Sequence, residues 1–176
     1  MDDKTFWDII AVACQPGGDP DEWREGLVAQ LKKLEPEEIV AFDHLFDEKT
    51  NALYTADHWG AAYLINGGAS DDGFYYFRCW LVGRGRKVYE AALADPDSLA
   101  DVVEPGEEYE AEIYGAAPSA WRELGLDDEA YTEAYTKGGK RGRLKLKGRR
   151  WDYGSDRQVR KRLPRLAAMY LHEGEE

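Results

Sequence analysis

The sequence predicts an all-α fold: a single orthogonal domain of several helices, with at most one short strand or hairpin near residues 143–153. Three observations support this prediction. Apolar residues recur at three- and four-residue spacing in nearly every segment, which is typical of amphipathic helices. Glycines, prolines and short polar residues stand where helices would start and stop. A chain of 176 residues is about the size of one domain and can bury a core without disulfide bonds.

The first half of the chain is expected to hold three or four helices. Apolar spacing predicts helices over residues 4–14, 20–34 and 36–65, each preceded by an acidic cap or begun by a proline. The third contains one glycine, Gly60, and no proline after its first residue. It therefore forms either one long helix or two helices joined near Asn51. The glycine pair of "INGG" supplies the left-handed residue that ends it.

The second half alternates short helices with breaks. Ser70 caps a predicted helix over residues 71–82, whose first turn carries two aspartates. The leucines of "GRLKLKGRRW" alternate with basic residues, which indicates a short strand or an extended arm. A last helix begins after Ser155, and Pro164 either kinks it or starts a new helix. Further helical segments are predicted at residues 87–95, 97–103, 109–113, 121–124 and 128–137.

Charge divides the chain into three predicted parts. These are an acidic helical domain over residues 1–136, a basic arm or loop over 137–153, and a C-terminal helix over 154–173 packed on the same domain. Residues 1–136 carry 30 acidic and 10 basic side chains, whereas residues 137–165 carry 13 basic and 2 acidic ones. This asymmetry indicates either a binding segment or an internal clamp between the arm and the acidic body.

Several classes of protein are disfavoured. The N-terminus lacks the apolar stretch of a secretory signal, and no window has the roughly 20 apolar residues that span a bilayer. Cys14 and Cys79 lie in apolar sequence, which is typical of buried thiols in a reducing compartment. We therefore expect a cytoplasmic protein with no membrane partner. No nucleophile, metal-ligand or phosphate-loop motif is legible, so the sequence assigns no catalytic residue, no metal and no cofactor, and it favours a non-enzyme.

Arg78 raises the sharpest question, because it falls within the apolar arc of the helix over residues 71–82. A guanidinium buried there needs a partner, since an unpaired buried charge costs several kcal/mol. Its neighbours on the same helix are not acidic, so we expect the partner to come from another helix, with Asp43 or Asp57 as candidates. The alternatives are a receptor for an anion or carboxylate, and a side chain that reaches the surface.

A cleft for a small ligand is predicted near the "DHWG" and "NGG" segments, where an acid, a histidine and an indole lie close together in the sequence. The aspartates after "NGGAS" are better explained as favourable charge in a first helical turn. The candidates for ligand binding are Asp57, His58, Trp59, Asn66, Asp71, Arg78 and Trp80.

The basic segment is the strongest signal outside the predicted core. Its bases, with two aromatic residues among them, fit an arm that contacts phosphates and stacks on nucleobases. The alternative is an arm that lies against its own acidic body. The candidates for polyanion binding are Lys140, Arg141, Arg143, Lys145, Lys147, Arg149, Arg150 and Trp151.

Four stretches of the chain resemble a known family. They are "FWDII", "EEIVAFDHLFDE", "WGAAYLINGGASDDGFYYFRCWLVGRGRKVYEAALADPDSLADV" and the closing "RLPRLAAMY". They are similar to the uncharacterised bacterial domain-of-unknown-function family DUF4240, over about residues 4–114 and the last helix. The resemblance implies a shared fold and brings no activity with it. The basic "KGGKRGRLKLKGRRW" lies outside the family's pattern.

These observations lead to an expected function. We expect a non-catalytic binding or regulatory module of a bacterial cytoplasm, whose acidic helical surface meets a basic protein partner. Binding of nucleic acid, or another polyanion, through residues 137–165 is the first alternative. An enzyme or small-ligand receptor with a cleft near Asp57, Asn66 and Arg78 is the second. The sequence leaves the oligomeric state open.

Overall fold

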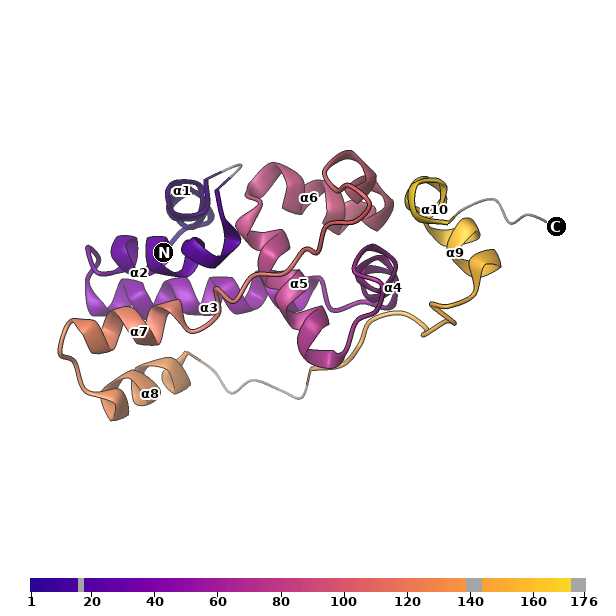
Figure 1. Ribbon diagram of the computed structural model, residues 1–176. Helices are drawn as coiled ribbons and strands as arrows, with labels where there is room; N and C mark the ends of the chain where they lie inside the picture. Colours follow the sequence, from indigo (N-terminus) through magenta and orange to yellow (C-terminus); the bar gives the residue numbers. More distant parts are fainter. Residues whose placement is uncertain (16–17, 139–143, 172–176) are drawn as a thin grey trace.

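The computed structural model confirms the mostly helical fold and describes residues 1–15, 18–138 and 144–171 (Figure 1). Within these ranges it contains ten α-helices, one 3-10 helix and one isolated parallel β-bridge, between Thr55 and Lys147. None of the described helices has the length and apolar character needed to cross a bilayer. The elements are α1 (Asp3–Ala13), α2 (Pro20–Leu31), α3 (Pro36–Ala52), α4 (Ala56–Ile65), α5 (Asp71–Gly83), α6 (Arg86–Ala94), η1 (Pro96–Asp101), α7 (Ala116–Glu123), α8 (Asp128–Lys137), α9 (Asp156–Arg162) and α10 (Pro164–Tyr170).

The helices cross at large angles. In Figure 1, α2, α3 and α7 run along the plane of the picture, whereas α1, α4 and α10 are seen end-on. Helix α2 packs between α1 and α7, and α3 packs on α5, α7 and α8. At the other end of the molecule, α10 packs on α4, α9 and η1. Helices α4 and α5 contact each other and connect the two ends.

The core combines aromatic and aliphatic side chains, and several of its aromatic rings contact one another. The rings of Phe6 and Phe42 lie 5.0 Å apart, and those of Trp59 and Phe74 lie 4.8 Å apart. Burying one such side chain stabilises the folded state by about 1.5–3 kcal/mol. The largest fully buried side chains are Trp80, Phe6, Phe42, Phe74, Phe77, Ile10, Leu27, Leu31, Ile39, Leu53, Leu81 and Leu99.

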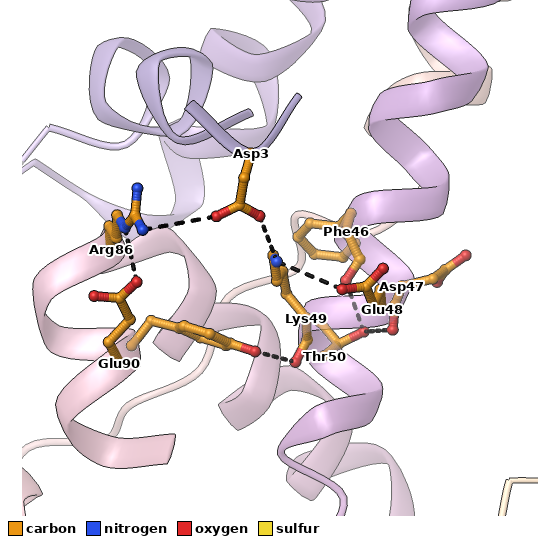
Figure 2. A network of polar contacts seen from close by, with 9 residues as sticks. Asp3, Phe46, Asp47, Glu48, Lys49, Thr50, Arg86 and Glu90 are labelled. Atoms are coloured by element: carbon orange, nitrogen blue, oxygen red, sulfur yellow. Dashed lines mark hydrogen bonds and ion pairs between the residues drawn. The ribbon is translucent and has the colours of Figure 1, made fainter. Parts of the chain in front are cut away.

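A polar network joins α1, α3 and α6 near the end of α3 (Figure 2). Lys49 Nζ lies 2.6 Å from the carboxylate of Asp3 and 3.5 Å from that of Glu48. The Tyr89 hydroxyl donates to the Lys49 carbonyl oxygen at 3.1 Å. The Lys49 side chain is 14% exposed, so this pair is better shielded from water than an ordinary surface ion pair. The network fixes the last turns of α3.

Residues 36–65 form two helices rather than one. The segment 53–55 joins α3 to α4, and the Thr55 hydroxyl oxygen accepts a hydrogen bond from the His58 backbone N–H at 3.2 Å. This bond is an N-cap, which satisfies a backbone donor at the start of α4. Of the two alternatives that the sequence left open, the break close to Asn51 is therefore confirmed.

Residues 104–115 are not helical, so the helical turn predicted at residues 109–113 is wrong. Ala111 and Ile113 are buried while the residues between and beside them are more exposed, which is the alternation of an extended chain. In a helix the glutamates of this segment would repel one another at four-residue spacing. We call residues 104–112 the acidic strap.

Pro164 starts a new helix, α10, which confirms one of the two predicted alternatives. The cap residue before it, Leu163, has no side-chain acceptor for the first amides of the helix. Asp97 in η1 supplies the acceptors: its carboxylate accepts from the backbone N–H groups of Arg165 and Leu166, both at 2.9 Å. Asp97 is 4% exposed, so this contact is a buried, charge-assisted cap. It joins the C-terminal helix to the rest of the domain.

Asp97→Ala is expected to lower the free energy of unfolding by about 1–3 kcal/mol, because two N–H groups lose their buried acceptor. Chemical denaturation measures the loss, and hydrogen exchange at the Arg165 and Leu166 amides should accelerate. The control is Asp101→Ala, which removes an exposed ion pair with Arg165 and should cost less than about 1 kcal/mol. Equal losses in the two variants would contradict the capping role.

Candidate functional site

Arg78 lies on α5 with only 4% of its surface exposed. Its Nε donates to the Phe74 carbonyl oxygen at 3.3 Å, and its Nη1 donates to the Thr50 carbonyl oxygen at 3.0 Å. The guanidinium carbon lies 4.9 Å from the ring centroids of Tyr54 and Phe74 and 5.2 Å from that of Tyr75. This side chain therefore joins the end of α3, the turn that follows it and α5.

The predicted carboxylate partner of Arg78 is wrong. No Asp or Glu side chain within the described residues forms an ion pair with it. Asp43 accepts from the Tyr131 hydroxyl at 2.6 Å, and Asp57 contacts the arm. The positive charge is met instead by a carbonyl at the negative end of α3 and by the π faces of three rings. Burial lowers the pKa of Arg78, but an arginine remains charged in proteins.

His58 is a neutral histidine of the core, with 3% of its surface exposed. Its Nε2 lies 2.9 Å from the Ala92 carbonyl oxygen, and its Nδ1 lies 2.7 Å from the Thr55 hydroxyl oxygen. Because a carbonyl only accepts, the ring hydrogen is on Nε2, and Nδ1 accepts from the hydroxyl. Burial lowers the pKa of His58, which favours the neutral ring. Both ring nitrogens are occupied, so His58 links α4 to the end of α6.

Asn66 and Trp80 hold the acidic strap rather than line a cleft. The Asn66 amide donates to the Tyr109 carbonyl oxygen at 3.3 Å and accepts from the Tyr109 N–H at 3.1 Å. The Trp80 ring packs 4.8 Å from the Tyr109 ring. Asp71 is exposed in the first turn of α5, which Ser70 caps, as the helix-charge interpretation predicts.

Asp57 anchors the arm to α4. One of its carboxylate oxygens accepts from Trp151 Nε1 at 2.9 Å and from Arg162 Nη1 at 2.8 Å. The Trp151 ring lies against Gly60, where a Cβ atom would stand 2.2 Å from ring carbon Cζ2. Sequence analysis missed this packing. The available signal was Gly60 itself, since a glycine inside a helix often marks a close approach.

The backbone of the arm pairs with the turn before α4. The Ala56 N–H donates to the Lys147 carbonyl oxygen at 2.9 Å, and the Lys147 N–H donates to the Tyr54 carbonyl oxygen at 3.1 Å. Trp151 is turned toward α4, where its ring packs on Gly60 and its Nε1 donates to Asp57; the stacking role stays a prediction.

The basic candidates fall into two groups. Arg150 lies over the Trp59 ring, with its guanidinium carbon 4.6 Å from the ring centroid. The candidates with exposed side chains are Lys145, Lys147, Arg149 and Arg150. The remaining candidates, Lys140, Arg141 and Arg143, lie outside the described residues.

The seven ligand candidates do not converge on one cleft. They separate into contacts with the arm, the core around Arg78, the acidic strap, the link from His58 to α6 and the exposed first turn of α5. A hollow of about 600 Å³ lies along α8, and four smaller ones lie on α9, between α2 and α7, between α6 and η1, and between α2 and the strap. None of the seven candidates lines any of these five hollows. In the part of the chain that the structure describes, no three His, Cys, Asp or Glu side chains gather as metal ligands do.

The geometry defines a small helical domain in which most of the candidate side chains connect parts of the fold. The chain belongs to the family described as "Protein of unknown function (DUF4240)", which matches residues 1–123. This match confirms the resemblance seen over residues 4–114, while the last helix lies outside it. No curated protein and no solved structure matches the chain.

Two substitutions of Arg78 test whether its buried charge is stabilised without an ion pair to a carboxylate. Arg78→Met should change the free energy of unfolding by less than about 2 kcal/mol, because the loss of a donor to Thr50 is offset by removal of a buried charge. Arg78→Lys should be more destabilising, since it keeps the buried charge but loses the planar, two-point donor. Denaturant unfolding measures both. If Arg78→Met alone lowers the free energy of unfolding by more than about 3 kcal/mol, a buried carboxylate has lost its partner. That result would contradict the conclusion that no carboxylate pairs with Arg78.

The lowered pKa of His58 predicts a pH dependence of stability. An unfolded imidazole takes up a proton near pH 6.5, whereas the folded ring stays neutral to lower pH. The contribution of His58 is therefore fully present above about pH 6.5 and is lost as the pH falls toward the folded pKa, by at most about 1.4 kcal/mol per pH unit. Urea unfolding between about pH 7.5 and 5.5 should show this loss, and His58→Gln should reduce the slope. An unchanged slope in the variant would exclude His58 as its source.

Proposed function

We propose that this chain is a non-catalytic binding or regulatory module of a bacterial cytoplasm, and that its acidic helical surface meets a basic protein partner. The observation that supports the proposal is the acidic strap. It carries five glutamates, and in the described part of the chain none of them forms an ion pair with a lysine or arginine. They are Glu104, Glu107, Glu108, Glu110 and Glu112.

The strap is held in place before any partner arrives. Its backbone is bound on both sides of Tyr109 by Asn66, and the Ala111 N–H donates to the Tyr76 carbonyl oxygen at 3.2 Å. The Tyr109 hydroxyl accepts from the Glu104 N–H at 2.7 Å. A surface that is already ordered loses less conformational entropy on binding, which favours affinity.

The position of Glu110 in the strap raises the pKa of its carboxyl group. Burial raises the pKa of Glu110, and the neighbouring charges of Glu108 and Glu112 raise it further. Glu110 and Glu112 also line a hollow of about 300 Å³ with Asp21, at the start of α2. Arg24, on the same hollow, donates to the Ser119 hydroxyl at 2.8 Å. The hollow holds three carboxylates and one guanidinium, so its net negative charge fits a lysine or arginine side chain of a partner.

The charge of the whole body favours the same kind of partner. Residues 1–136 carry 30 acidic and 10 basic side chains. A surface of one sign attracts partners of the opposite sign and raises the rate of association more than it raises final affinity. The partner should therefore carry an excess of lysine and arginine, and its binding should weaken as salt increases.

A pull-down with the immobilised chain at about 50 and about 150 mM salt tests the proposal. A protein rich in lysine and arginine should be enriched, more strongly at the lower salt. The variant Glu107→Gln/Glu108→Gln should lose most of this protein, because both side chains are exposed on the strap.

The matched control is Glu37→Gln/Glu129→Gln, which removes the same charge from α3 and α8 and should retain the partner. No enriched protein at either salt concentration would overturn the proposal. So would an enriched protein that both variants retain equally, because its binding would not depend on the strap.

A further inference from the structure

Six basic side chains on the arm and on α9 face solvent and form what we call the basic ridge. The described segment 144–165 carries nine bases and two acids. Three of the nine have other partners: Arg162 pairs with Asp57, Arg165 pairs with Asp101, and Arg160 has a contact of its own. The ridge consists of the others, Lys145, Lys147, Arg149, Arg150, Arg157 and Lys161.

The ridge is not neutralised by the acidic body. Within the described residues none of its six members forms an ion pair with a carboxylate. Arg150 contacts the Trp59 ring, which leaves its charge in place. The internal-clamp alternative therefore holds for the backbone and the aromatic residues of the described arm, but not for the six bases of the ridge.

The ridge is positioned by rigid contacts. Two backbone hydrogen bonds tie Lys147 to the turn before α4, and Trp151 is locked between Gly60 and Asp57. Tyr153 packs edge-on against Trp151 at 4.7 Å. The bases are therefore carried by an ordered support, so that ligand binding does not require the described arm to fold.

The two halves of the ridge meet at Arg162. This side chain lies 5.4 Å from the Trp151 ring centroid on the arm side. On the other side it lines a hollow of about 410 Å³ together with Arg157, Gln158 and Lys161. Arg162 thus lies between the arm and the hollow of α9, with its own charge paired to Asp57. Two exposed acids, Asp152 and Asp156, lie among these bases in the sequence.

We infer that the basic ridge binds the phosphate backbone of nucleic acid, independently of base sequence. Phosphate groups along a duplex present one negative charge about every 1.7 Å, which provides many partners for a row of lysines and arginines. The aromatic rings of the arm face inward, so recognition rests on charge rather than on base stacking. At about 0.1 M salt the acids that lie more than about 10 Å from the ridge are screened, because the Debye length is about 10 Å.

The same inward-facing rings argue against a membrane. Peripheral membrane proteins place tryptophan and other apolar side chains into the interface beside their bases. Here Trp151 and Tyr153 are half-buried against α4, and Leu144, at 44% exposure, is the one large apolar side chain of the described arm that is classed as exposed. An acidic protein would offer a lower and less regular charge density than a nucleic-acid backbone.

The test measures binding of the full chain to a short, fluorescently labelled DNA duplex of mixed sequence over a series of salt concentrations. Binding is expected at about 50 mM salt, with log K falling linearly as log salt rises. Lys147→Gln/Arg149→Gln and Arg157→Gln/Lys161→Gln should each reduce the magnitude of that slope by about 2, since each lost phosphate contact removes about 0.9. All four side chains are exposed, and circular dichroism verifies that the variants fold.

The matched control is Lys33→Gln/Lys87→Gln, which removes the same charge from exposed positions on the acidic body and should leave the slope unchanged. Absence of binding at about 50 mM salt would overturn the inference, as would an equal slope in the ridge and control variants. Poly-glutamate and vesicles of anionic lipid serve as competitors. Displacement of the duplex by either one at a lower charge concentration than by unlabelled duplex would assign the ridge to that other class of ligand and overturn the inference.

Discussion

One buried charge, the guanidinium of Arg78, connects the end of α3, the turn after it and α5. It donates to a carbonyl at the end of α3 and to one within α5, while the rings of Tyr54, Phe74 and Tyr75 surround it. Buried arginines are usually paired with a carboxylate, which satisfies the charge but adds a second desolvated ion. Here the end of a helix supplies the negative potential, so only one ion is desolvated. The geometry of the turn between α3 and α4 then follows, because the carbonyl of Thr50 must point at α5.

The turn between α3 and α4 also binds the backbone of the arm. Lys147 pairs with the backbone on both sides of Thr55, and Thr55 also orients the His58 ring toward the end of α6. One short segment therefore positions the core arginine, the core histidine and the basic ridge. The acidic strap is attached separately, through Asn66 at the other end of α4. Helix α4 thus contacts both of these segments of opposite charge.

The sequence predicted what depends on local spacing. The helix over residues 71–82, its Ser70 cap and the new start at Pro164 agree with the structure, because caps and periodicity act within a few residues. The strap was mispredicted because Tyr109 and Ile113 fit both helical and extended spacing, and the choice depends on Asn66, which is 43 residues away in the chain. The partner of Arg78 was missed because every residue has a backbone carbonyl, so no residue type identifies the one that accepts from Arg78. The anchoring of Trp151 on Gly60 was missed for a related reason, since it joins distant segments.

The buried cap on α10 also shows that residues inside the family match contact residues outside it. Asp97, Asp57 and Gly60 all lie within the residues that match the family, yet their contacts reach beyond residue 123, into the arm, α9 and α10. The stretch that matches the family is therefore shorter than the set of segments that pack together in this structure. A fragment cut after α7 would carry a buried carboxylate without its amides and an apolar face without its cover. The limits of sequence similarity are, for this chain, the wrong place to divide it for expression.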